Sequence, residues 1–217
     1  SKAKNIATKM IGDFPEHGES YKIMGRVNLY YEENADAIDN FLEGINYNNE
    51  DQDSYTYLSD AYVKNGEAVE ARPALEKGLK TVKNKLPLMI ELIKLAEHDG
   101  NYKNSYLYVS QLKLDENFKA QAFIYQGILN LAEGKSKDAI KSFESANQAG
   151  GNKNLVVSEL SKISVAEDND DMRYNYAIAL NNSGASELAA QELEKIVNSG
   201  RISENISKAR ELLSSLR

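Results

Sequence analysis

LAEGKSKDAIKSFESA, residues 131–146, contains a glycine, Gly134, followed by a small residue at Ala139 and an aromatic one at Phe143. The same spacing occurs twice earlier in the chain, each time 34 residues further back. The earlier sets are Gly66, Ala71 and Leu75, and Gly100, Ser105 and Val109. Self-similarity at a fixed period of this length indicates stacked structural units that share one continuous core. The sequence therefore predicts a repeat protein.

The 34-residue frame extends over most of the chain. It places repeats at 18–51, 52–85, 86–119 and 120–153, and a fifth at 170–203. Each repeat carries large apolar and small residues along two successive helices. The pattern is carried by Tyr21, Gly25, Ala37 and Phe41; by Tyr55, Leu58, Ala71 and Leu75; by Met89, Leu92, Ser105 and Val109; by Phe123, Gly127, Ala139 and Phe143; and by Ala177, Leu180, Ala189 and Leu193.

This pattern resembles the tetratricopeptide repeat (TPR) family over nearly the whole chain. The chain departs from the family in having no tryptophan and no proline at the end of a repeat, and in placing Glu32 where a turn glycine is expected. The resemblance implies an all-α fold, a right-handed alpha-alpha superhelical solenoid of stacked antiparallel helix pairs. It also implies that residues 1–217 form a single domain.

Helix ends and helix contacts follow from the small residues. We expect thirteen helices, with left-handed caps at the glycines that end first helices, namely Gly66, Gly100, Gly134 and Gly184. Small residues should let paired helices approach closely, with Gly25 facing Ala37, Gly127 facing Ala139 and Ala177 facing Ala189. An all-helical chain also requires its prolines, at 15, 73 and 87, to lie near helix starts or ends.

Three segments fall outside the five repeats. Residues 1–15 match the second helix of a preceding repeat, so we expect the chain to begin in mid-repeat, with more protein upstream. Residues 154–169 break the period and predict an extra helix, which either packs into the core or reshapes the binding groove. Residues 203–217 predict an amphipathic capping helix, with Ser203 as its N-cap.

Composition excludes several classes of function. The net charge of −7 and the pI near 5.1 argue against a nucleic-acid partner. No apolar run approaches the roughly 20 residues of a membrane span, so no membrane insertion is expected. The chain has no cysteine, which excludes disulfides and thiolate chemistry and is compatible with an extracytoplasmic bacterial protein.

No residue pattern points to catalysis, and we expect no enzyme activity, no cofactor and no metal. The two histidines, His17 and His98, lie in no metal-spaced cluster. The acidic runs 50–53 and 168–171 lack the spacing of a calcium loop. Both runs precede predicted helices, so we interpret them as solvated charge at helix N-termini.

The family resemblance implies that the first helices of the repeats line a concave groove. Residues on one face of those helices are then the candidates for partner binding: Lys22, Arg26, Tyr30, Lys94, Ile124, Ile128, Tyr174 and Ile178. The groove would run from cationic to apolar. A peptide with acidic residues near one end and aliphatic residues near the other would complement it.

The predicted function is a non-enzymatic protein–protein interaction scaffold that binds a protein or peptide partner in this groove. Two alternatives stay open. The chain could be a structural spacer that self-associates, or a regulatory segment of a larger protein.

Overall fold

The computed structural model describes residues 1–102, 104–166, 168–201 and 204–216. Within these ranges the chain forms thirteen α-helices and no strand, which confirms the predicted all-α class. The first six helices are α1 (Lys2–Asp13), α2 (Gly18–Tyr30), α3 (Asn34–Tyr47), α4 (Gln52–Lys64), α5 (Ala68–Thr81) and α6 (Leu86–Asp99). The other seven are α7 (Ser105–Leu112), α8 (Lys119–Ala132), α9 (Ser136–Gln148), α10 (Lys153–Leu160), α11 (Asp170–Asn182), α12 (Ser186–Val197) and α13 (Asn205–Ser215).

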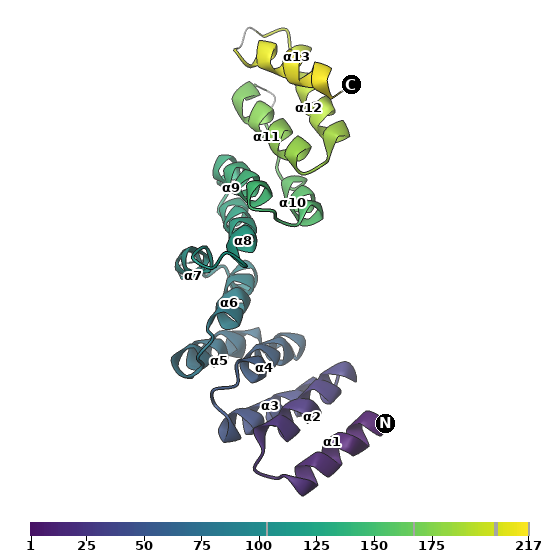
Figure 1. Cartoon of the computed structure of the whole chain (residues 1–217), viewed down its shortest axis with the longest axis vertical. Helices are drawn as coiled ribbons and strands as arrows, with labels where there is room; N and C mark the ends of the chain where they lie inside the picture. The colour runs from purple at the N-terminus through teal and green to yellow at the C-terminus, as the bar shows by residue number, and fades with distance from the viewer. Residues whose placement is uncertain (103, 167, 202–203, 217) are drawn as a thin grey trace. The chain divides into compact units, whose positions relative to one another are not determined.

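The chain divides into two compact units, Ser1–Asn101 and Tyr102–Arg217, called unit 1 and unit 2 below. In unit 1, α2 packs against α3 and α4 against α5; in unit 2, α8 packs against α9 and α11 against α12 (Figure 1). These are the antiparallel helix pairs of the predicted solenoid. The division falls inside the third predicted repeat, after its first helix.

The turns between paired helices depend on left-handed backbone conformations. Gly66, Gly100, Gly134 and Gly184 have φ angles of +82°, +67°, +73° and +87°, as predicted. The first repeat reaches the same conformation with Glu32, at φ +60°. Glu32 is the one residue other than glycine with a positive φ among those the structure describes. A side chain is strained in this region, because its Cβ approaches the following carbonyl oxygen.

In two of the helix pairs, a glycine of the first helix lies against a phenylalanine ring of the second helix. A Cβ added to Gly25 of α2 would lie 2.6 Å from the Phe41 ring of α3, and one added to Gly127 of α8 would collide with the Phe143 ring of α9. The small partners expected from the sequence, Ala37 and Ala139, are fully buried but are not the nearest neighbours. The glycines therefore make room for the two phenylalanine rings.

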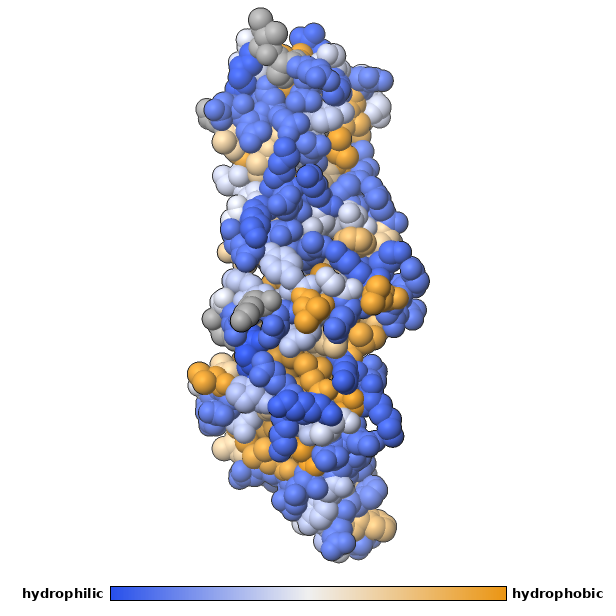
Figure 2. Space-filling model, turned by 90° about the vertical axis from the view of Figure 1, so that its left-hand side faces the viewer, coloured by the Kyte–Doolittle hydropathy of each residue, from blue (hydrophilic) through white to orange (hydrophobic). Residues whose placement is uncertain are grey.

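One proline departs from the expected placement near helix ends. Pro15 follows α1 and Pro87 lies in the first turn of α6, but Pro73 lies inside α5. A proline there lacks the N–H that would bond the carbonyl of Val69, one turn earlier. Both Pro73 and Val69 are exposed, and Val69 is 84% exposed, so water can replace the missing bond. Figure 2 shows hydrophobic side chains gathered on one face of unit 1, in the lower half of the view.

The extra helix is shorter than the sequence predicted. Helix α10 ends at Leu160, although Ile163 beyond it is still buried, at 8% exposure. The Arg173 guanidinium donates to the carbonyls of Val165 and Ala166, at 3.2 and 3.1 Å. These bonds hold Val165 and Ala166 outside any helix, where the apolar pattern alone suggested more helix. Within unit 2, α10 adds Val156 and Leu160 to the hydrophobic core.

The interpretation of both acidic runs as solvated charge is wrong for one residue in each. Asp51 accepts a hydrogen bond from the Ser54 hydroxyl at 2.7 Å, and it forms an ion pair with Lys22 at 3.1 Å. Asp170 is only 6% exposed and forms an ion pair with Arg201. Cations distant in the sequence reach these carboxylates, which spacing along the chain cannot reveal.

The last helix lies on the final predicted repeat. Helix α13 packs against α12 and places Ala209 and Leu213 in the core of unit 2. The predicted N-cap, Ser203, lies outside the described residues.

Candidate functional site

The eight predicted partner-binding residues divide evenly between the two units. Lys22, Arg26, Tyr30 and Lys94 lie in unit 1, and Ile124, Ile128, Tyr174 and Ile178 lie in unit 2.

Lys22 bridges two parts of unit 1. Its Nζ atom lies 2.7 Å from Glu19 of the same helix and 3.1 Å from Asp51, just before α4. Burial acts to lower the pKa of Lys22, but hydrogen bonds and charge attraction from Glu19 and Asp51 outweigh it, so the pKa lies above its usual value. With only 9% of the residue exposed, Lys22 serves the packing of unit 1.

Arg26, one turn further along α2, is exposed and lies over an aromatic ring. Its guanidinium carbon is 5.2 Å from the centroid of the Tyr57 ring of α4. Tyr57 in turn stacks on Phe41, with centroids 5.7 Å apart and planes 19° apart. Among the residues that the structure describes, Arg26 has no carboxylate partner. A cation over a ring face is stabilised without losing its capacity to bind an anion.

A hollow of about 340 Å³ lies beside Arg26, and we call it the α1/α2 hollow. Tyr30 is 80% exposed at its rim and meets the edge of Tyr31, with ring centroids 5.1 Å apart. The hollow is lined by Ala3, Ile23, Arg26, Val27, Tyr30 and Tyr31. Two of the predicted binding residues, Arg26 and Tyr30, thus come together with apolar and aromatic neighbours.

Lys94, the fourth predicted residue of unit 1, lies on α6. Its Nζ atom forms an exposed ion pair with Glu91 at 2.7 Å. The side chain of His98, which the sequence places one turn further on, lies outside the described part of the structure.

The four predicted residues of unit 2 differ in exposure. Ile124 is 3% exposed and belongs to the hydrophobic core. Ile128 and Tyr174 are partly buried against that core. Ile178 is partly exposed and lines a hollow between α9 and α11. Ile124 is therefore a packing residue of unit 2.

The hollow beside Ile178, called the α9/α11 hollow, has a volume of about 300 Å³. It combines an apolar floor with charged groups from the second helix of one repeat, which the family resemblance did not mark as binding residues. It is lined by Lys137, Ile140, Lys141, Glu144, Ser145, Met172, Asn175 and Ile178. The signal that could have found these residues is the helical spacing of Lys137, Lys141 and Glu144 along one face of α9.

A hydrogen-bonded tyrosine fixes α7 in unit 2 rather than forming a reactive site. The Tyr106 hydroxyl donates to Glu133 at 2.7 Å and also lies 3.1 Å from the Asn130 side-chain oxygen. Burial, with the hydrogen bond to Glu133 and its charge, raises the pKa of Tyr106 well above its ordinary value. The hydroxyl therefore keeps its proton and acts as a structural donor.

The residues that the structure describes contain no cluster of three or more histidine, aspartate or glutamate side chains placed to hold a metal ion. None of their helices has the length and apolar character that crossing a bilayer requires.

No protein-family model and no curated protein matches the sequence. Several solved structures match the fold. YrrB, described as a TPR protein with an unusual peptide-binding site, is 17% identical with a TM-score of 0.56, and the match covers 94% of this chain and 97% of YrrB. PilW, a type IV pilus biogenesis factor, is 14% identical with a TM-score of 0.58, covering 94% and 87%. A tetratricopeptide repeat protein from Parabacteroides merdae is 14% identical with a TM-score of 0.53, covering 98% and 77%. The chain therefore has a tetratricopeptide-type repeat fold.

Proposed function

We propose that the chain is a non-enzymatic protein-interaction module that binds an acidic peptide segment of a partner protein at the α1/α2 hollow. One observation carries this proposal. The Arg26 guanidinium borders an exposed apolar hollow and is held by the Tyr57 ring, with no carboxylate partner among the described residues.

The chemistry of the hollow indicates the kind of segment that fits. A guanidinium matches the geometry of a carboxylate and can bind it through two parallel hydrogen bonds. Exposed tyrosines are enriched where proteins bind one another, because they bury a large area with few rotatable bonds. Tyr30 and Tyr31 supply such area beside Arg26. An acidic residue followed by an aliphatic or aromatic one would use both features.

Three other predicted residues, one exposed and two partly buried, remain part of this proposal. Lys94, Ile128 and Tyr174 are proposed as further contacts with the partner. The fold supports an interaction role in general terms, since the similar protein YrrB is described as having a peptide-binding site.

A peptide library displayed on phage tests the proposal. Peptides selected on the full chain would be synthesised, and their affinities measured by calorimetry for the wild type, Arg26→Glu and Tyr30→Ala. We expect selected peptides to be rich in aspartate and glutamate, and Arg26→Glu to weaken binding about tenfold or more. Lys22 is left unchanged, because a carboxylate there would face Glu19 and Asp51 and unfold the site.

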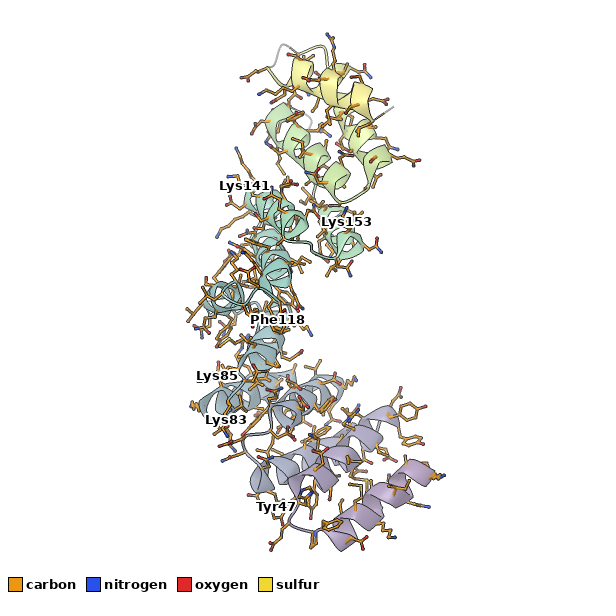
Figure 3. All side chains as sticks on the ribbon, in the orientation of Figure 1. Tyr47, Lys83, Lys85, Phe118, Lys141 and Lys153 are labelled. Carbon is orange, nitrogen blue, oxygen red and sulfur yellow. The ribbon has the colours of Figure 1, made fainter. Side chains whose placement is uncertain are left out.

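Lys85→Glu is the matched control for the charge change. Lys85 is exposed beside the start of α6, and it does not line the α1/α2 hollow (Figure 3). We expect this variant to bind the selected peptides as the wild type does. Selected peptides without acidic residues, or full affinity in Arg26→Glu, would contradict the proposal.

Self-association is a second candidate, and exposed apolar residues of the N-terminal region favour it. Ile6 of α1 is 52% exposed, and Phe14 beyond its end is 60% exposed. Light scattering over a range of concentrations tests this candidate. A rise in mass that Ile6→Lys abolishes would support it, and a constant monomer mass would remove it.

A further inference from the structure

We propose that unit 2 carries a second binding site, in which the α9/α11 hollow takes an aliphatic side chain of a peptide segment and the adjacent residue of that segment is acidic. This site shares no residue with the α1/α2 hollow, so it stands or falls independently of the function proposed above.

The floor of the hollow suits an aliphatic side chain. Ile140 is 3% exposed and forms the base, and Met172 and Ile178 of α11 flank it. The volume of about 300 Å³ holds one leucine-sized side chain with part of its backbone. Methionine adapts its shape to a bound group more readily than branched residues do. The hollow can therefore close on leucine, isoleucine or methionine.

A carboxylate oxygen in the lining has no partner. Glu144 accepts a hydrogen bond from Asn182 through Oε1, at 2.6 Å. Its second oxygen, Oε2, is buried and accepts no hydrogen bond. A buried acceptor without a donor is unfavourable, and a turn of the Glu144 side chain toward a donor on a ligand would relieve it. The proposed donor is the backbone N–H of the bound aliphatic residue, whose side chain would occupy the apolar floor.

Two exposed lysines, Lys137 and Lys141, lie at the rim of the hollow in a chain of net charge −7. Lys141 has 69% of its side chain exposed, and its ion-pair partner, Asp138, is 4.0 Å away. Lys137 is 63% exposed and lies 3.2 Å from Asp171. Both ion pairs are exposed and therefore contribute little free energy, so the two ammonium groups favour an acidic residue next to the aliphatic one and disfavour a basic residue there.

Blocked dipeptides used as probes test this site directly. The probe is acetyl-Leu-Asp-amide, titrated into the full chain with ¹³C-labelled isoleucine and methionine methyl groups and followed by NMR. We expect the methyl signals of Ile140, Met172 and Ile178 to shift as the probe binds. Acetyl-Ser-Asp-amide lacks the aliphatic side chain and should leave them in place. Absence of any shift with acetyl-Leu-Asp-amide, up to its solubility limit, would overturn the proposal.

The role of Glu144 is tested by changing the probe instead of the protein. Methylating the leucine nitrogen of acetyl-Leu-Asp-amide removes the N–H that should donate to Oε2, and it leaves the protein unaltered. We expect this probe to bind at least about tenfold more weakly, since the buried acceptor would again lack a donor. Equal binding of the methylated probe would overturn the assignment of Glu144 Oε2.

The charge preference is tested with two matched lysine variants of unit 2. Lys141→Glu should weaken acetyl-Leu-Asp-amide by about threefold, the size of one partly exposed ion pair, and should bind acetyl-Leu-Lys-amide better than the wild type does. Lys153→Glu changes an exposed lysine of α10 outside the hollow and should change neither affinity (Figure 3). Tighter binding of acetyl-Leu-Lys-amide to the wild type would overturn the acidic preference.

The titration with acetyl-Leu-Asp-amide also tests whether the α9/α11 hollow acts independently of the α1/α2 hollow. Arg26→Glu should bind acetyl-Leu-Asp-amide at the α9/α11 hollow with unchanged methyl shifts. A shift lost in that variant would show that the hollow is not an independent site and would overturn the inference.

Discussion

Gly127 of α8 and the Phe143 ring of α9 lie so close that no side-chain atom fits between them. Glycine costs helix stability relative to alanine, yet here it permits the contact that pairs the two helices. The same relationship between Gly25 and Phe41 occurs in unit 1.

Gly127→Ala should therefore destabilise the chain by about 1–3 kcal/mol, because the Phe143 ring must leave its position to admit the methyl group. Gly12→Ala is the control, since nothing lies within 4 Å of a Cβ at Gly12 of α1. That change should stabilise the chain by up to about 1 kcal/mol through helix propensity. Urea unfolding followed by circular dichroism measures both. Equal effects of the two substitutions would show that the ring is free to move.

Glu32→Gly should stabilise the chain, since Glu32 holds a left-handed conformation at φ +60° where the other first-helix turns use glycine. Relief of strain of about 1–2 kcal/mol is partly offset by the greater freedom of glycine in the unfolded chain. The expected net gain is about 0.5–1 kcal/mol. The reverse change at the matching turn, Gly66→Ala, should lose a similar amount. Thermal midpoints of the two variants give the comparison.

Lys22→Met should destabilise unit 1 by about 1–3 kcal/mol, because Asp51 then loses the cation that balances it. Adding Asp51→Asn to that variant should recover part of the loss. The raised pKa of Lys22 sets the pH dependence. The stabilisation that the Lys22 charge provides is complete below the ordinary lysine pKa of 10.5, and it is lost as pH rises through the higher pKa of the folded state. The stability gap between wild type and Lys22→Met should therefore narrow only in strong alkali.

Tyr106→Phe should cost unit 2 about 1–2 kcal/mol at neutral pH, through the lost hydrogen bond to Glu133. Since the folded state raises the pKa of Tyr106, the bond is fully present below the ordinary tyrosine value of 10.0. Above that value the unfolded chain releases the proton first, and stability falls as pH rises. Unfolding measured at several alkaline pH values should show this fall more steeply in the wild type than in Tyr106→Phe. Parallel curves would contradict it.

The sequence alone predicts the helix pairs and their turns well, because both depend on local chemistry. The glycines that end first helices at a fixed interval all adopt a left-handed conformation. The repeat pattern also identifies Glu32 as the residue that replaces glycine at this position in the first repeat. Pro73 was placed wrongly because its tolerance inside α5 depends on exposure, and exposure follows from tertiary packing.

Binding residues are harder to predict than helices for the same reason. Helical spacing placed Lys22 and Arg26 on one face, but it could not show that Asp51 reaches Lys22 while Tyr57 lies under Arg26. Nor could it reveal Glu144, whose partnerless oxygen is visible only once α9 and α11 are packed together.

The boundary between the two compact units, after Asn101, does not coincide with a boundary between sequence repeats. A 34-residue period marks the structural repeat, which adds one pair of helices at a time. A compact unit contains the segments that pack together, and here unit 1 ends in the middle of the predicted repeat 86–119. Anyone dividing this chain for expression, fusion or domain exchange should therefore cut between α6 and α7, at the loop near residue 101, and not at the repeat boundaries after residues 85 or 119.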